Sequence, residues 1–212
     1  MNELLTPIPT IYRGIKFRSR LEARWALFFD EIGLAYHYEL EGFESERTRY
    51  LPDFFIPSWN TWIEIKPKEP TTEEWRKCEE LLISLLKTGK TASVAILYGR
   101  PWLDERGPEY RYLSLEPMIG FHPDSDDSEE GIDVTVENLT SEYIDSDERI
   151  FTECRRCQKI RLDSLGMHFP DKALSGYCGV HGCCDRESAT RPDSSKLMNA
   201  YKVATERDFS VA

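Results

Sequence analysis

The sequence YLPDFFIPSWNTWIEIK, residues 50–66, contains two short apolar segments that are predicted to form neighbouring β-strands. The only charged residues within it are Asp53, Glu64 and Lys66. Unpaired charge is costly to bury, so charged groups in core strands normally pair with one another or hold a metal ion. Because side chains alternate along a strand, we expect Glu64 and Lys66 to lie on the same face of the sheet.

Each of these charged residues also has a purely structural interpretation. Asp53 follows Pro52 and could be a turn residue, while Glu64 and Lys66 could form an ion pair on the surface. Three features of the sequence favour a functional site instead. The flanking residues are strongly apolar, a helix that contains an acid precedes the strands, and a capped amphipathic helix and an apolar strand follow them.

The predicted order of elements is helix, three strands, helix, strand, which indicates an α/β fold with a mixed sheet flanked by helices. Apolar periodicity and capping residues give the boundaries. The expected elements are a hairpin at 11–17, a helix from Ser19 to Gly33, strands at 35–40, 50–56 and 61–66, a helix capped by Thr71 and Glu74, strands at 92–98 and 110–116, and a last helix at 193–207.

The net charge of −11 is concentrated in one part of the chain. Residues 122–150 contain eleven acidic residues and one basic residue, whereas 1–121 and 151–212 are close to neutral. Such an acidic run is typical of a solvated linker, and a strap that covers a basic surface is the alternative. We therefore predict a main domain at 1–121, an acidic linker or strap at 122–150, and a small module with a C-terminal helix at 151–212.

The composition favours a cytoplasmic protein with no membrane partner. No segment approaches the roughly 18 consecutive apolar residues that span a bilayer. The first ten residues, MNELLTPIPT, lack the basic flank and apolar core of a signal peptide. In a reducing compartment the six cysteines are expected to be thiols or metal ligands.

Five of the six cysteines lie between residues 154 and 184, which favours a structural metal site. Two pairs of potential ligands, each with two residues between its members, are separated by twenty residues, and this spacing predicts a zinc-ribbon-like module with four Zn²⁺ ligands. The expected ligands are Cys154, Cys157, Cys178 and His181, with Cys183 or Cys184 as an alternative fourth ligand.

The pattern Pro52-Asp53, ten residues, then Glu64-Ile65-Lys66 resembles the signature of the PD-(D/E)XK nuclease superfamily. The stretches FRSRLEARWALFFDEIGLAYHYELEGFE (17–44), YLPDFFIP (50–57) and WIEIK (62–66) further resemble small phage and bacterial endonuclease-like proteins, akin to very-short-patch repair and transposon end-cleaving endonucleases. The resemblance covers about residues 11–100 and does not single out a substrate.

The resemblance implies a nuclease core that hydrolyses phosphodiester bonds in DNA with Mg²⁺ or Mn²⁺ as cofactor, and it does not exclude RNA. Asp53, Glu64 and the backbone carbonyl of Ile65 would bind the metal ion. Lys66 would orient the attacking water or stabilise charge on the phosphate. Glu22, on the predicted first helix, would be the fourth residue of the site and help to hold the metal ion.

Glu22 also has a plainer interpretation, as a surface acid of the helix paired with Arg18 or Arg20. Basic residues near the first helix and near the first cysteine pair are expected to contact nucleic-acid phosphates, although each could be an ordinary solvated side chain. The expected contacts are Arg13, Lys16, Arg18, Arg20, Arg24, Arg155, Arg156 and Lys159.

Three functions are compatible with these patterns. The first is an endonuclease, acting alone or as a homodimer. The second is a non-catalytic DNA-binding protein that retains the fold. The third is a protein-interaction factor that uses its acidic segment as the contact. The complete Asp53, Glu64 and Lys66 set favours the first.

Overall fold

The computed structural model describes residues 7–44, 49–87, 93–104, 107–108, 112–117, 144–164, 190–191 and 193–209. Its helices are α1 (Arg20–Glu31), α2 (Thr72–Lys87) and α3 (Ser195–Glu206). Its strands are β1 (Thr10–Tyr12), β2 (Ile15–Phe17), β3 (His37–Tyr38), β4 (Phe43–Glu44), β5 (Arg49–Tyr50), β6 (Phe54–Ile56), β7 (Thr61–Lys66), β8 (Ser93–Tyr98), β9 (Leu103–Asp104), β10 (Gly107–Pro108), β11 (Tyr112–Pro117), β12 (Ile144–Cys154), β13 (Ile160–Ser164) and β14 (Thr190–Arg191).

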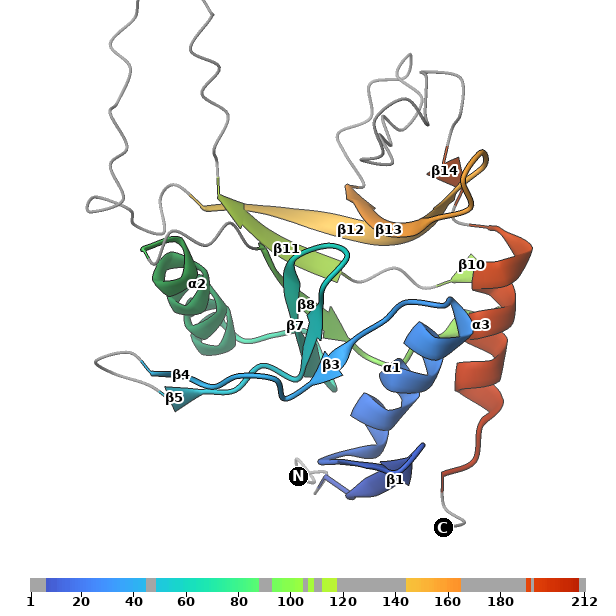
Figure 1. Cartoon of the computed structure of the whole chain (residues 1–212), viewed down its shortest axis with the longest axis horizontal. Helices are drawn as coiled ribbons and strands as arrows, with labels where there is room; N and C mark the ends of the chain where they lie inside the picture. The colour runs from blue at the N-terminus through green and yellow to red at the C-terminus, as the bar shows by residue number, and fades with distance from the viewer. Residues whose placement is uncertain are drawn as a thin grey trace, which may run out of the picture.

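A mixed sheet forms the centre of the molecule (Figure 1). Its strand order is β13-β12-β11-β8-β7-β6-β3, and β14 pairs with β12. Only β7 and β8 run parallel, with α2 between them in the chain, while the other pairs in this sheet are antiparallel. The predicted α/β class with a mixed sheet flanked by helices is confirmed.

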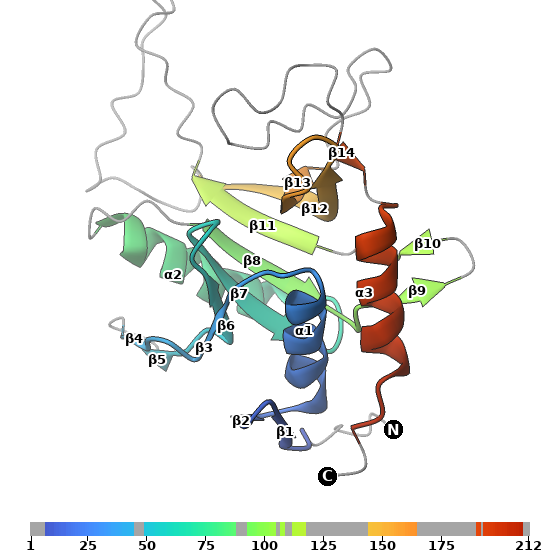
Figure 2. The ribbon, with the colours of Figure 1, turned by 45° about the vertical axis from the view of Figure 1, so that its right-hand side comes forward.

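The helices cover the two faces of this sheet. Helices α1 and α3 lie next to each other on one side, and α2 lies on the other, as Figure 2 also shows. Among the described helices, none combines the length and the apolar character needed to cross a membrane.

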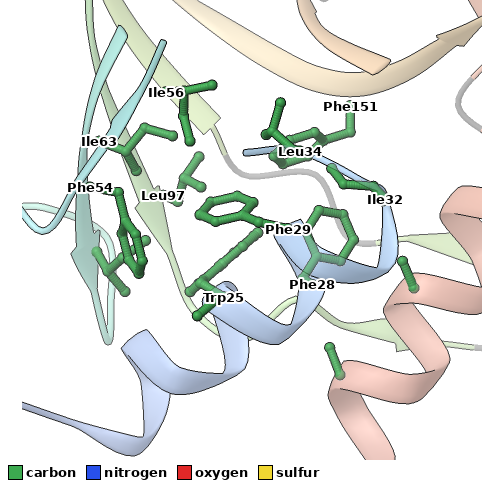
Figure 3. Packing of buried hydrophobic residues seen from close by; sticks show 14 of the residues in the cluster. Trp25, Phe28, Phe29, Ile32, Leu34, Phe54, Ile56, Ile63, Leu97 and Phe151 are labelled. Carbon is green, nitrogen blue, oxygen red and sulfur yellow. The ribbon is translucent and has the colours of Figure 1, made fainter. Parts of the chain in front are cut away.

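An aromatic cluster joins α1 to the sheet (Figure 3). The ring of Phe29 meets that of Phe54 at 5.3 Å between centroids, and Phe28 meets Phe151 at 5.0 Å. Trp25, on the same helix, is fully buried. Large buried aromatic side chains contribute much of the apolar area that stabilises such a core. This core fixes α1 against β6 and therefore sets where the first turn of α1 lies.

The alternation predicted for β7 is confirmed by the two hydrophobic clusters. Ile63 and Ile65 belong to the cluster on the α1 side, whereas Trp62 belongs to the cluster around α2. Glu64 and Lys66, which alternate with the isoleucines, therefore lie on the α2 side of the sheet.

Several predicted boundaries are confirmed and others are wrong. Ser19 caps α1, and Gly33, with φ +70°, follows its end. The expected strand at 35–40 is only His37–Tyr38, and the expected strand at 50–56 is divided into β5 and β6 by residues 51–53. Pro52 lacks a backbone N–H, so it cannot complete a ladder at this point.

The predicted boundary after residue 150 is wrong, because it falls inside β12. Residues 144–149 pair with β11 in the main sheet, so this part of the expected acidic linker is a strand. Phe151, Leu197 and Tyr201 belong to the same core as α1, so the described part of 151–212 is not a separate module. Residues 122–143 of the expected linker lie outside the described residues.

Candidate active site

Asp53 and Glu64 face each other across the end of a strand pair. Strands β6 and β7 are antiparallel with Phe54 opposite Ile63, so the next step places Asp53 opposite Glu64. The ladder stops there, and the Ile65 N–H instead donates to Asp53 Oδ2 at 2.7 Å. Both carboxylates are buried, with Asp53 2% and Glu64 7% exposed.

The backbone of Ile65 is directed to the same place. Gly99 N–H donates to the carbonyl of Lys66 at 2.8 Å, so the peptide groups of Lys66 face β8. Backbone groups alternate in direction along a strand, so the N–H and carbonyl of Ile65 face β6, where Asp53 lies. The predicted set of Asp53, Glu64 and the Ile65 carbonyl is therefore brought together.

Glu22 reaches this site from the first turn of α1. Its carboxylate accepts hydrogen bonds from the Tyr38 hydroxyl at 2.6 Å, from Ser19 Oγ at 2.7 Å and from the Arg18 N–H at 3.1 Å. It is 7% exposed. The interpretation of Glu22 as a surface acid is wrong, because it is buried at the edge of the sheet and its negative charge acts on Asp53.

The buried carboxylates act on one another. Burial, and then the charges of Glu64 and Glu22, raise the pKa of Asp53 well above its ordinary value, although the Ile65 N–H and Arg18 oppose the shift. Like charges in a low-dielectric site disfavour the ionised form. A divalent cation bound beside Asp53 would reduce this repulsion.

Two basic side chains partly compensate the negative charge. Arg18 donates to Asp53 Oδ1 and to Glu39 Oε1, the latter at 2.7 Å. Lys66 Nζ lies 2.9 Å from Glu64 Oε1 and 3.3 Å from an oxygen of Glu74. Burial alone would lower the pKa of Lys66, but the two glutamates outweigh it and raise that pKa. Lys66 is therefore a cation and hydrogen-bond donor at neutral pH.

The site fits a hard divalent metal ion in its chemistry. Glu64 Oε2 is buried and has no hydrogen bond of standard geometry among the described residues, although the Tyr50 hydroxyl lies close enough for the Glu64 carboxylate to raise its pKa. A buried, unpaired carboxylate oxygen is costly and suits a ligand that the oxygen could bind. Carboxylate and carbonyl oxygens are the donors that Mg²⁺ and Mn²⁺ prefer. Asp53, Glu64 and the Ile65 carbonyl would hold the ion, with Glu22 beside them.

The ion pairs must rearrange before such an ion can bind. Within the described residues, no three acidic, histidine or cysteine side chains are grouped closely enough to hold a metal ion. Arg18 engages Asp53, and Lys66 engages Glu64. Arg18 is half exposed, with 51% of its side chain accessible, so it can turn away into solvent. Metal binding at Asp53 is therefore expected to displace the Arg18 guanidinium.

Several contacts of the site have no counterpart among the sequence predictions, and three of them involve ion pairs or hydrogen bonds of the charged residues. Tyr38 holds Glu22, Glu39 shares Arg18 with Asp53, and Glu74 shares Lys66 with Glu64. The position of Glu74 could have been predicted from the sequence. Its capping box with Thr71 is confirmed, and this places the Glu74 carboxylate at the start of α2. No local sequence pattern predicts the contacts of Tyr38 and Glu39, because the positions of both residues depend on the pairing of β3 with β6.

The predicted phosphate contacts near α1 are not brought together at the site. Arg13 pairs with Asp30 at 3.3 Å, and Arg24 donates to the carbonyls of Ala204 and Thr205 at the end of α3. Of this group, Arg18 reaches the carboxylates. Lys16 is exposed, as are Arg155, Arg156 and Lys159 in and near the turn between β12 and β13.

The first cysteine pair adopts a tight turn. Cys157 N–H lies 3.5 Å from Cys154 Sγ, and Gln158, with φ +58°, donates to the Cys154 carbonyl at 2.9 Å. An amide directed at sulfur stabilises a thiolate, which is the form that binds zinc. The other expected ligands, Cys178, His181, Cys183 and Cys184, lie outside the described residues. Cys78 lies on α2 and is buried in the hydrophobic cluster between this helix and the sheet.

Lys66 lines one hollow, and a second hollow begins at the next residue, Pro67. The smaller has a volume of about 260 Å³ and is lined by Arg49, Tyr50, Lys66, Glu74 and Lys77. Tyr50 donates to or accepts from Cys78 at 3.4 Å, and burial is the main cause that raises the pKa of its hydroxyl far above the ordinary value. The larger hollow lies at the ends of β7 and β8.

No protein family, curated protein or solved structure matches this chain.

The carboxylates predict a pH-dependent response to Mn²⁺. Because the pKa of Asp53 is raised, protonated Asp53 favours the metal-free fold at low pH, and this stabilisation is lost as the pH rises through the raised value. Mn²⁺ binds the ionised form, so its effect should grow over the same range. We expect saturating Mn²⁺, at about 100 times its dissociation constant, to stabilise the protein by about 2.7 kcal/mol. Differential scanning calorimetry between pH 6 and pH 8 measures this.

Glu64→Gln and Asp53→Asn should abolish the Mn²⁺ effect. Glu31→Gln is the matched control, because Glu31 is exposed at the opposite end of the helix that carries Glu22. An equal Mn²⁺ effect in Glu64→Gln and in the unchanged protein would show that the ion binds elsewhere.

Proposed function

We propose that this protein is a Mg²⁺- or Mn²⁺-dependent endonuclease of the PD-(D/E)XK type that hydrolyses phosphodiester bonds in DNA. The observation that carries the proposal is the position of Asp53 opposite Glu64, one step beyond the last pair of β6 and β7. One Glu64 oxygen is buried without a hydrogen bond, and Lys66 lies beside it. Carboxylates, a positioned cation and a backbone carbonyl at one sheet edge meet the needs of metal-assisted hydrolysis.

Each residue has a separate role in this proposal. A bound divalent ion would lower the pKa of its water ligand and neutralise charge on the phosphate. Asp53, Glu64 and the Ile65 carbonyl would position that ion, and Glu22 would add negative charge close to it. Lys66, with its raised pKa, would donate to a non-bridging phosphate oxygen or to the attacking water. Its protonation does not suit the role of general base.

Arg18 gives a specific reason to consider a second function. Its guanidinium already compensates Asp53, which is what a fold without catalytic activity would need. The alternative is therefore a non-catalytic DNA-binding protein in which Arg18 permanently replaces the metal ion. The two functions differ in whether Arg18 leaves Asp53 when Mn²⁺ is present.

Cleavage assays test the proposed activity. The protein is incubated with plasmid and short duplex DNA in Mg²⁺ or Mn²⁺, and products are resolved on gels. We expect cleavage that EDTA abolishes, and a loss of at least about a hundredfold in Asp53→Asn, Glu64→Gln and Lys66→Ala, as for groups that stabilise charge in a transition state.

Glu31→Gln is again the control and should cleave at the original rate. Activity that survives in Asp53→Asn would exclude this mechanism, because a contaminating nuclease or another site must then act. No cleavage of any DNA or RNA form, together with normal DNA binding, would favour the non-catalytic alternative.

We also propose a structural Zn²⁺ ion bound through Cys154 and Cys157, with ligands from the second cysteine group. The turn that directs the Cys157 amide at Cys154 Sγ supports this proposal. We expect about one equivalent of zinc in protein purified without added metal, measured by inductively coupled plasma mass spectrometry, and much less in Cys157→Ser. Cys78→Ser is the control, because Cys78 lies on α2 and its side chain is buried in the hydrophobic core. Purified protein that contains no zinc would contradict the proposed zinc site.

A further inference from the structure

The larger hollow lies where the parallel strands β7 and β8 end, and its lining begins at Pro67, directly after Lys66. Its volume is about 480 Å³, and it is lined by residues 67–69 after β7 and by residues 98–100 and Trp102 at the end of β8 and after it. Hollows of roughly 300–1,000 Å³ are the usual size of ligand sites. The ends of neighbouring parallel strands are a common place for such sites.

The backbone at Gly99 connects this hollow rigidly to the carboxylate site. Gly99 N–H donates to the Lys66 carbonyl at 2.8 Å, and its own carbonyl accepts from Trp25 Nε1 at 3.0 Å. Gly99 has φ +75°, and a Cβ built there would meet nothing within 4 Å, so its α-carbon faces open space. Lys68 lies only two residues beyond Lys66, which limits their Cα separation to less than about 8 Å.

The lining combines aromatic rings with positive charge. Trp102 is 39% exposed, which is unusual for tryptophan in this chain, and Tyr98 lies in the same wall. Lys68 and Arg100 supply the cations, and Glu69 is the one acid in the lining. Among the described residues, no carboxylate is in ion-pair contact with Lys68 or Arg100.

A third cation lies close to Arg100. Burial and then the charge of Arg100 lower the pKa of Arg24, although Asp208 opposes this. Positive charges that repel one another at a surface favour the binding of an anion. An exposed indole beside such cations matches the two parts of a nucleotide, because the base stacks on the ring and the phosphate pairs with the cations.

We propose that this hollow binds an unpaired nucleotide adjacent to the phosphodiester bond that is cut. The base would stack on Trp102, and its phosphate would contact Lys68 and Arg100. Within a duplex both faces of a base are covered by its neighbours, so only a single-stranded or extruded base can enter a hollow and stack on a side chain. The inference rests on the proposed nuclease function and specifies its substrate as DNA with an unpaired nucleotide at the cleavage point.

Binding measurements test this inference without cleavage. Fluorescence anisotropy compares a short labelled single strand with a blunt duplex of the same length, in Ca²⁺ in place of Mg²⁺, with gels to verify that the DNA stays intact. We expect tighter binding of the single strand and about a tenfold loss in Trp102→Ala, as for one lost stacking contact. Trp102→Phe keeps an aromatic face and should stay within about threefold of the original affinity.

The cations give a second readout. Lys68→Gln and Arg100→Gln should each reduce the slope of log affinity against log salt by about 0.7, the value for one phosphate contact to a single strand. Lys87→Gln is the matched control. Lys87 is exposed at the far end of α2, about 20 Å along the helix from Glu74. Circular dichroism and thermal unfolding show that each variant is folded.

The possible outcomes separate this inference from the proposed function. Single-strand affinity that is equal in Trp102→Ala and the unchanged protein would overturn the nucleotide site, even if the protein cuts DNA through Asp53 and Glu64. Equal binding of blunt duplex and single strand would also overturn it. A protein that binds no nucleic acid at all would overturn both.

Discussion

The site depends on two buried carboxylates that lie opposite each other, Asp53 directly before β6 and Glu64 in β7. The Ile65 N–H donates to Asp53 beside Glu64, and burial and the neighbouring negative charges both disfavour ionisation of Asp53. Such an arrangement is stable only if cations compensate it. In the described chain Arg18 and Lys66 do so incompletely, because one Glu64 oxygen stays unpaired. A divalent ion would complete the compensation, and this connects the electrostatics of the fold to the proposed chemistry.

The rest of the fold fixes the geometry of that pair. The aromatic core between α1 and β6 places the first turn of α1, and hence Glu22, at the edge of the sheet. The capping box at the start of α2 directs Glu74 to Lys66 from the opposite face. Because β7 and β8 run parallel, both strands end on the same side of the sheet. The carboxylates and the larger hollow therefore both lie at this end of the two strands.

Local patterns predicted much of this arrangement and failed where long-range pairing decides. The alternation in β7 and the caps at Ser19 and Thr71 depend on neighbouring residues, and each is confirmed. The acidic composition before residue 150 suggested a linker. In fact residues 144–149 pair with β11, a contact that depends on a strand more than 25 residues earlier in the chain.

Contacts that are distant in the chain also decide where the basic residues lie. Their sequence clustering predicted a common phosphate-binding surface, but partners distant in the chain separate them. Arg24 is directed to the end of α3, 180 residues later, and Arg18 to Asp53, 35 residues later. The exposed Trp102 and the hollow around it have no sequence signature, since they arise from two strand ends that meet only in the folded sheet.

A crystal structure with Mn²⁺, using the anomalous scattering of manganese, tests the central claim most directly. We expect a manganese peak with oxygens of Asp53 and Glu64 at the roughly 2.0–2.6 Å typical of hard divalent cations, and an Arg18 guanidinium turned away from Asp53. No manganese between these carboxylates at saturating concentration, with Arg18 still bound to Asp53, would contradict it.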